Sequence, residues 1–260
     1  MLGLVDAASG VTRHEGSLLM TTLNGKKLVV LGGTSGIGLA AAKAGVLAGA
    51  TVVVASSRRQ SVYAAVAELG ASATGHVADL ADESQARALF ERIGELDHLI
   101  FTAGENLLLG PLASLDLATV RRAFELRVFG AIAAAKHAAP RIRAGGSIVL
   151  THGIAGRRPP QPGWTVGTTI CGAIESLTRA LAVELAPVRV NAVSPGFVRT
   201  PLWGSIPEAD REAMYRDAGA RLLTRKVGEP QDIAEAYMYL LGNGFTTGQT
   251  LVVDGGGTLT

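Results

Sequence analysis

The chain has 260 residues, a length that suits one α/β domain or two small ones. Hydrophobic residues make up 48%, so a large core is possible, and the net charge of +2 comes without a Lys/Arg block long enough to indicate nucleic-acid binding. Cys171 is the only cysteine, which excludes an internal disulfide and favours a reducing cytoplasm. No apolar run reaches membrane-spanning length. We therefore expect a cytoplasmic protein with a small-molecule ligand and no nucleic-acid, membrane or metal partner.

The N-terminal segment differs from the rest of the chain. Residues 1–22 are mixed in composition and aperiodic, and they lack the long apolar stretch of a signal peptide. Met20 lies a few residues before the first predicted strand. We expect residues 1–22 to be a disordered extension or an over-long start, with an ordered arm as the alternative, and residues 23–260 to form one nucleotide-binding domain.

The stretch Lys27–Gly38 organises the rest of the chain. An apolar strand runs into glycines at Gly-x-x-x-Gly-x-Gly spacing, after which a helix-favouring segment begins. Such glycines allow a tight turn and a close approach of the backbone to a pyrophosphate, and the helix N-terminus offers free N–H groups to the phosphates. A tight turn without a ligand is the alternative, but the strand before and the helix after favour a nucleotide site. The residues expected to contact the cofactor here are Gly32, Thr34, Ser35, Gly36, Ile37 and Gly38.

Strands and helices alternate along the remainder of the chain. The predicted strands are short and apolar, as in a parallel sheet buried on both faces, and the predicted helices are Ala-rich and amphipathic. Right-handed crossovers then give a single-domain α/β fold, a Rossmann-like doubly wound parallel sheet of about seven strands. The strands are expected at Lys27–Gly32, Thr51–Ser56, Ala73–Ala78, Asp97–Thr102, Gly146–Thr151, Arg189–Val193 and Gln249–Val253. The helices are expected at Ile37–Ala48, Gln60–Leu69, Glu83–Ile93 (with Asp82 as its N-cap), Leu117–Ala139, Thr168–Leu185 and Gln231–Leu241.

A polar and basic segment follows the second strand. An NAD-binding fold usually has an acidic residue here for the ribose hydroxyls, whereas this chain has Ser56, Ser57, Arg58 and Arg59. Two hydroxyls and two guanidinium groups suit the 2′-phosphate of NADP. A solvated loop with two surface arginines is the alternative. We predict NADP rather than NAD as the cofactor, with Ser57, Arg58 and Arg59 among its contacts.

Three motifs carry a resemblance to a known family. They are the glycines of residues 32–38, the segment Asn191–Thr200 of the form Asn-x-x-x-Pro-Gly-x-x-x-Thr, and Val253–Gly256 near the C-terminus. From about Met20 to the C-terminus, the chain resembles the short-chain dehydrogenases/reductases. Leu31 stands where that family has Thr in its glycine motif.

The resemblance implies further cofactor contacts. Asp79, followed by Leu80, matches the residue that contacts the adenine edge, although a turn or capping role is the alternative. The family has Asn-Asn-Ala-Gly beside the cofactor ribose, where this chain has Phe101, Thr102, Ala103 and Gly104. Beside the nicotinamide the resemblance implies Pro195, Gly196, Val198 and Thr200, with a Pro-Gly turn that binds nothing as the alternative.

The catalytic motif of the family is missing from this chain. The family uses a Tyr, a Lys one helical turn later, a Ser after the fifth strand and an Asn on the preceding helix. The flanking residues put Gly167 at the Tyr position and Cys171 at the Lys position, and no Tyr-x-x-x-Lys occurs in residues 140–190. Gly153 takes the Ser position and Arg127 the Asn position. Gly167 has no side chain to transfer a proton, so the family reaction would need another acid.

A few side chains near these positions are candidates for catalysis. His152, at the end of a central strand, is either a substitute acid or a structural residue. Arg127 replaces the missing ammonium, clamps a substrate carboxylate, or forms a salt bridge with Glu105. Cys171 is expected to be a small packing residue, because no base flanks it. The volume left by Tyr and Lys must be refilled by a larger ligand or by Arg127, His152 and Trp164.

Two functional hypotheses follow. The first is an oxidoreductase that acts on a small carbonyl or alcohol of unknown identity, with a non-standard acid or with water supplying the proton. The second is a catalytically inactive or non-redox protein that keeps NADP(H) as a structural, sensing or scaffolding ligand. Residues 202–227 are expected to form a variable substrate lid or ordinary helix core. The resemblance also implies a homotetramer or homodimer formed through the helices of residues 117–139 and 168–185.

Overall fold

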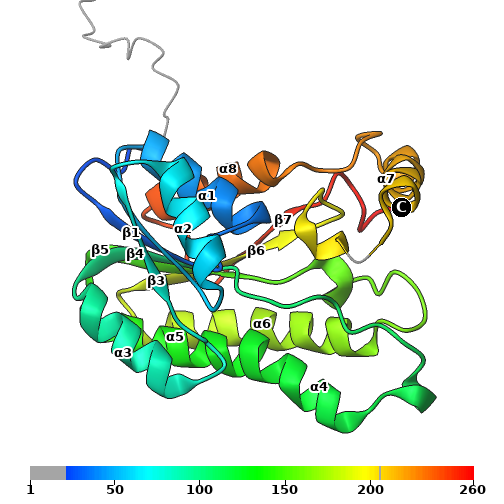
Figure 1. The fold of residues 1–260 in the computed structure, drawn as a ribbon, viewed down its shortest axis with the longest axis horizontal. Helices are drawn as coiled ribbons and strands as arrows, with labels where there is room; N and C mark the ends of the chain where they lie inside the picture. The colour runs from blue at the N-terminus through cyan, green and yellow to red at the C-terminus, as the bar shows by residue number, and fades with distance from the viewer. Residues whose placement is uncertain (1–21, 205) are drawn as a thin grey trace, which may run out of the picture.

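The computed structural model describes residues 22–204 and 206–260. Within them the chain forms one parallel sheet of seven strands in the order β3-β2-β1-β4-β5-β6-β7 (Figure 1). The predicted doubly wound α/β fold is therefore confirmed, whereas the extension expected over residues 1–22 lies, except for Thr22, outside the described residues. The strands are β1 (Lys27–Leu31), β2 (Thr51–Ser56), β3 (Ala73–Val77), β4 (Leu96–Phe101), β5 (Ile142–Thr151), β6 (Arg189–Pro195) and β7 (Thr250–Val253).

Helices cover both faces of the sheet (Figure 1). The helices α3 to α6 lie on one face and α1, α2 and α8 on the other, while α7 lies apart from both layers, close to the C-terminus. Their bounds are α1 (Gly36–Leu47), α2 (Arg59–Leu69), α3 (Glu83–Ile93), α4 (Leu117–Phe124), α5 (Gly130–Ala138), α6 (Thr165–Glu184), α7 (Glu208–Arg221) and α8 (Pro230–Gly242). None of these helices is long and apolar enough to cross a membrane.

Two apolar layers, one on each face of the sheet, make up the core. Side chains alternate along a strand, so Leu28 and Val30 of β1 join the layer beneath α1 and α8, whereas Val29 and Leu31 join the layer beneath α3, α5 and α6. All of these side chains are fully buried. Because helices cover both faces, the strands are apolar along their length, which is why the sequence pattern predicted parallel strands.

Some helices differ from the prediction. The helix expected over residues 117–139 is interrupted by a π-helical turn at Glu125–Phe129, which separates α4 from α5. α6 begins at Thr165 instead of Thr168, and part of the expected lid forms α7, of which only Tyr215 and Gly219 are buried. An apolar repeat does not distinguish α-helical from π-helical turns, and a mostly polar helix gives a weak repeat. The predicted N-cap of α3 is confirmed, since Asp82 accepts a hydrogen bond from the Ser84 N–H at 2.9 Å.

The strand order fixes where a ligand binds. β1 pairs with β2 on one side and with β4 on the other, so the chain continues toward opposite edges of the sheet after these strands. In a doubly wound sheet a crevice opens at such a point, beyond the carboxyl ends of the strands. The segments that follow β1 and β4 here are residues 32–35 and 102–105.

Candidate functional site

A cleft of about 860 Å³ opens at the carboxyl ends of the strands. Every residue expected from the sequence to contact the cofactor lines it, except Arg59. The candidate catalytic residues Arg127, His152 and Glu105 line it as well. The cofactor candidates in the lining are Gly32, Thr34, Ser35, Gly36, Ile37, Gly38, Ser57, Arg58, Asp79, Leu80, Thr102, Ala103, Gly104, Pro195, Gly196, Val198 and Thr200.

Two glycines at the turn after β1, Gly32 and Gly38, have no space for a side chain. Gly32 has a φ of +82°, and a β-carbon on it would lie 2.6 Å from the backbone N of Ala103. A β-carbon on Gly38 would lie 2.3 Å from the carbonyl oxygen of Gly32 and 2.4 Å from Thr102 Oγ1. α1 begins at Gly36, so its free N–H groups belong to residues of the cleft. This bare turn at a helix N-terminus fits a pyrophosphate.

The loop after β2 presents Arg58, but not Arg59, to the cleft. Arg58 is exposed and lines the cleft together with Ser56 and Ser57. Arg59 is the first residue of α2, and its Nη1 donates a hydrogen bond to Tyr63 Oη at 3.2 Å. No acidic side chain lies within the loop itself. Of the two arginines, only Arg58 is thus placed to meet a cofactor.

Asp79 lines the same part of the cleft but also has a local role. Its Oδ1 accepts a hydrogen bond from the Ala81 N–H at 3.0 Å, and its own N–H donates to Gln85 Oε1 at 3.0 Å. The turn role that was the alternative therefore exists beside the position in the cleft. Directly after β4, the Thr102 hydroxyl donates to the Leu31 carbonyl at 3.0 Å, so this hydroxyl joins the end of β4 to β1.

The Pro-Gly turn after β6 is held by the C-terminal segment. The Gly196 N–H donates to the Val253 carbonyl at 2.9 Å, and a β-carbon on Gly196 would lie 2.6 Å from Asp254 Cα. The Asp254 carboxylate accepts hydrogen bonds from the N–H groups of Gly256 at 2.9 Å and Thr258 at 2.8 Å. The motif of residues 253–256 thus packs behind the turn at Pro195 and Gly196, which lines the cleft.

Three of the positions expected for catalytic groups meet between β5 and α6. Gly167 and Cys171 lie four residues apart on α6 and share a face of it, and the Gly153 N–H donates to Cys171 Sγ at 3.2 Å. Burial raises the pKa of the Cys171 thiol, while backbone N–H groups and the Arg127 guanidinium act in the opposite direction. The thiol is therefore protonated at neutral pH and packs as a small side chain.

Trp164 fills the space beside Gly167. It is the N-cap residue of α6, and its indole lies 3.4 Å from the place where a β-carbon on Gly167 would stand. Trp164 also lines the cleft. One of the three side chains expected to refill the volume of the missing Tyr is therefore found there.

Arg127 comes from the π-helical turn and lies across Gly104. A β-carbon on Gly104 would lie 2.6 Å from Nη1, and Nη2 donates a hydrogen bond to the backbone carbonyl of Glu105. The side-chain ion pair with Glu105, which the sequence left open, is not formed. Burial lowers the pKa of the guanidinium, although Cys171 and Glu105 act to raise it. Even so, an arginine stays protonated in proteins.

His152 is tied to its surroundings through both ring nitrogens. The side chain is buried, with Nδ1 at 3.1 Å from the Gly153 carbonyl and Nε2 at 3.5 Å from Thr250 Oγ1. A carbonyl only accepts, so Nδ1 carries the proton and Nε2 accepts from the threonine. Burial lowers the pKa of His152, which keeps it neutral at pH 7. These contacts favour the structural role for His152 over that of a substitute acid.

Comparison with known proteins identifies the fold family. A family model described as enoyl-(acyl carrier protein) reductase matches residues 32–258, which is most of the chain. The chain belongs to the short-chain dehydrogenase/reductase family. The short-chain dehydrogenase/reductase ATR9 of Stachybotrys chlorohalonatus is 37% identical over 259 residues, covering 92% of this chain and 100% of that protein.

Solved structures agree with this membership of the short-chain dehydrogenase/reductase family. A small-chain dehydrogenase in complex with NADPH is 38% identical with a TM-score of 0.77, covering 90% of this chain and 99% of that one. The MalC reductase/Diels-Alderase of Malbranchea aurantiaca is 31% identical with a TM-score of 0.86, covering 93% and 99%. The family binds a nicotinamide cofactor, and the cleft with its bare glycine turn is the part of this chain that fits one.

Several residues of this short-chain dehydrogenase/reductase cleft were not anticipated from the sequence. They include Asn106, Leu107 and Leu108 after β4 and Arg158 after β5. Arg158 donates from Nη1 to the carbonyl of Gly257 at 3.0 Å, which joins the loop after β5 to the C-terminal segment. These loops have no periodic pattern, and the one available signal was their position directly after strands of a parallel sheet.

An aromatic cluster anchors the expected lid. The ring centroids of Phe197 and Trp203 are 4.7 Å apart, those of Phe197 and Tyr215 are 5.9 Å apart, and Arg199 Cζ lies 4.3 Å from the centre of the Tyr215 ring. Trp203 and Leu202 line the cleft, whereas Tyr215 is buried. Residues 202–204 and 206–227 therefore contribute both to the cleft lining and to the core.

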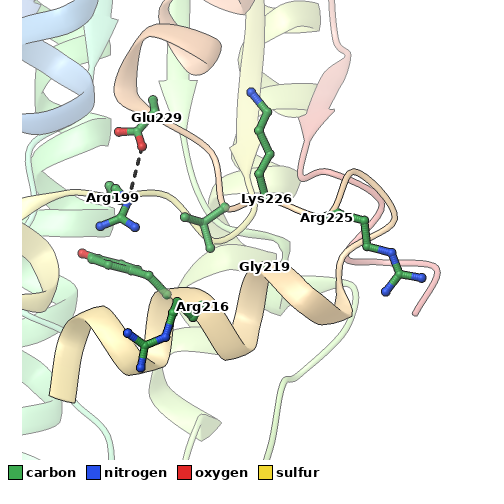
Figure 2. Close-up of a pocket in the computed structure, with 8 residues that line it drawn as sticks. Arg199, Arg216, Gly219, Arg225, Lys226 and Glu229 are labelled. Atoms are coloured by element: carbon green, nitrogen blue, oxygen red, sulfur yellow. Dashed lines mark ion pairs between the residues drawn. The ribbon is translucent and has the colours of Figure 1, made fainter. Parts of the chain in front are cut away.

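A second hollow, of about 260 Å³, lies between α7 and the segment before α8. Arg199 forms an ion pair there with Glu229 at 3.3 Å (Figure 2). A second ion pair joins Arg199 to Glu212 at 2.7 Å. The other labelled cations of Figure 2, Arg216 and Lys226 among them, point in different directions and do not converge on one centre. This hollow therefore does not rival the main cleft as a binding site.

Proposed function

We propose that the chain is an NADP(H)-dependent oxidoreductase with a non-standard active site, acting on a small carbonyl or alcohol. The observation that carries the choice of cofactor is Arg58, which lines the cleft after β2 in a loop that has no acidic residue. A guanidinium suits a 2′-phosphate, and an acid would suit the bare ribose of NAD. The 38% identical relative solved with NADPH supports the same choice.

Different segments of the cleft bind different parts of the cofactor. The glycine turn of residues 32–38 receives the pyrophosphate, and the wall of residues 195–200 orients the nicotinamide. NADPH, when bound, supplies a hydride to a carbonyl carbon. Because Gly167 has no side chain and burial makes the Cys171 thiol a weaker acid than usual, the product oxygen takes its proton from water. Trp164 and Leu202 line the same cleft.

The decisive experiment is NADPH oxidation, followed by absorbance, against a panel of aldehydes, ketones and quinones. We expect oxidation with at least one class and a slower reaction with NADH. Calorimetric titration with NADPH runs in parallel, because it separates a protein that binds without reacting from one that does not bind. Tight NADPH binding without turnover across the panel would contradict the proposal.

The second candidate function is a non-redox protein that keeps NADP(H) as a structural, sensing or scaffolding ligand. The glycines at positions 153 and 167, where the family motif has Ser and Tyr, favour it. The name of the 31% identical MalC reductase/Diels-Alderase couples a reductase with a non-redox reaction, which supports such a use of this fold. Binding without turnover in the same experiment is its expected signature.

A further inference from the structure

Arg127 is a half-buried cation in the cleft that pairs with no carboxylate of residues 22–204 or 206–260. A guanidinium has five N–H donors, and one hydrogen bond, to the backbone carbonyl of Glu105, is found within these residues. Removing a charge from water is costly unless the charge is paired and hydrogen-bonded. The remaining donors of the guanidinium are therefore available to an anionic ligand.

The position of Arg127 separates it from the phosphates of the cofactor. Its guanidinium lies across Gly104, in the segment after β4, and acts electrostatically on the thiol of Cys171 on α6. Arg58, which is expected to meet the 2′-phosphate, follows β2, and β1 with its glycine turn lies between β2 and β4 in the sheet. An anionic ligand of Arg127 would therefore lie near Gly153, Gly167 and Cys171, and not beside the phosphates of the cofactor.

The cleft that contains Arg127 is also lined by large apolar side chains. Trp164 lies against Gly167, and Leu107, Leu108 and Trp203 line the same cleft. Such walls suit the flat face of a conjugated or aromatic molecule. The ligand that satisfies both features has an apolar, planar body and a negatively charged oxygen.

We propose that Arg127 binds an anionic oxygen group of the substrate, so that the substrate class is a planar carbonyl compound bearing a carboxylate or an ionised enol. Both groups present a delocalised negative charge on oxygen to the guanidinium fork. The inference rests on the proposed function only in taking the ligand to be the carbonyl substrate. The position of the Arg127 guanidinium depends on Gly104, because any larger residue there would displace the guanidinium.

The test uses binding, which needs no turnover. The chain has two tryptophans, Trp164 and Trp203, and both line the cleft, so intrinsic fluorescence reports on this site. The full-length protein saturated with NADP⁺ is titrated with phenylglyoxylate and its neutral methyl ester, and with dimedone and its neutral enol methyl ether. We expect at least one anion to bind about tenfold or more tightly than its neutral partner, as hydrogen bonds to charged groups imply.

Substitutions then assign the preference to Arg127. Arg127→Met is expected to reduce the anion-to-neutral ratio to about one, and Arg127→Lys to retain part of it. Arg121→Met removes an exposed charge from the neighbouring α4 and should leave the ratio unchanged. If circular dichroism shows that Arg127→Met does not fold, the comparison is made between Arg127→Lys and the unmodified protein. An anion-to-neutral ratio that is the same in both would then count against the inference.

The outcomes distinguish this inference from the proposed function. A preference for phenylglyoxylate alone assigns a carboxylate, and a preference for dimedone alone assigns an ionised enol. Equal binding of anions and neutral partners to the unmodified protein would overturn the inference, as would a ratio that survives Arg127→Met. An anion preference that depends on Arg127, found without NADPH oxidation, would overturn the proposed reductase activity but support the anion site. Turnover of neutral ketones without any Arg127-dependent anion preference would support the reductase activity but overturn the anion site.

Discussion

The Trp164 indole lies within van der Waals reach of the place where a side chain on Gly167 would begin: a β-carbon there would lie 3.4 Å from Cε3 and 3.8 Å from Cζ3 of the ring. A side chain at position 167 would therefore extend toward the indole ring. A tyrosine at position 167 would have to share the volume of the indole, and a lysine at position 171 would meet the charge of Arg127. The substitutions at these positions are therefore coupled.

This coupling predicts the result of restoring the family motif. Gly153→Ser, Gly167→Tyr and Cys171→Lys together should give little carbonyl reduction while Trp164 and Arg127 stay in place. Adding Trp164→Ser and Arg127→Asn should then raise kcat/KM by about 10²–10⁴, the usual contribution of general acid–base catalysis. The measurement is NADPH oxidation with one neutral ketone for all variants. Equal activity of the triple and the quintuple variant would show that Trp164 and Arg127 do not block the site.

The cofactor preference should depend on Arg58 and not on Arg59. Arg58→Asp should weaken NADPH binding by about tenfold or more, since hydrogen bonds to charged groups contribute about 1.5–3 kcal/mol. Arg59→Asp is the matched control, because the Arg59 guanidinium bonds to Tyr63 on its own helix. Calorimetric titration with NADPH and NADH measures both variants. Equal affinity of the unmodified protein for the two cofactors would contradict the prediction.

Two helical glycines should respond in opposite ways to alanine. A β-carbon on Gly38 would lie 2.3 Å from the Gly32 carbonyl, so Gly38→Ala should destabilise the fold by about 1–3 kcal/mol, as overpacking does. A β-carbon on Gly172 would meet nothing within 4 Å, so Gly172→Ala should stabilise α6 by about 0.5–1 kcal/mol. Urea denaturation measures both free energies of unfolding. A neutral Gly38→Ala would mean that α1 moves freely relative to β1.

His98 should make the stability depend on pH. It is buried with Nδ1 at 2.9 Å from Ser147 Oγ, and burial lowers its pKa from 6.5 to about 4. As the pH falls, the unfolded chain takes up this proton first, so the free energy of unfolding should fall between about pH 6.5 and pH 4, by about 3 kcal/mol for this group alone. Urea denaturation across this range measures the slope, and NMR should show a His98 ring that stays neutral until about pH 4. A His98 ring that titrates near pH 6.5 in the folded protein would contradict this.

Association should involve the helices on the α4–α6 face. Phe129 is 55% exposed on this face, as large apolar side chains often are where subunits meet. We expect a homotetramer or homodimer by light scattering, and a shift to smaller species in Phe129→Asp. Leu47→Asp, at the end of α1 on the other face, is the control and should not change the mass. A monomeric mass for the unmodified protein by light scattering at micromolar concentration would contradict this prediction.

The sequence alone determined the features that depend on the backbone and on neighbours along the chain. The glycine spacing of residues 32–38 limits the turn because only glycine avoids a clash there, and the alternation of apolar strands with Ala-rich helices limits the sheet to a buried parallel one. The loop of residues 56–59 could be interpreted as suited to a 2′-phosphate because its side chains are contiguous. These motifs were sufficient for the fold and for the part of the cleft lining that the glycine turn and the loop after β2 supply.

Only the tertiary structure decided which side chains meet near the vacant catalytic positions. Arg127 pairs with the carbonyl of Glu105 rather than with its carboxylate, His152 reaches Thr250 of β7, and Trp164 covers Gly167. The first two contacts join residues 22 and 98 positions apart, and all three depend on rotamers chosen by packing. A sequence motif records which residues occupy the site, but the direction of a long side chain is set by the space that its neighbours leave.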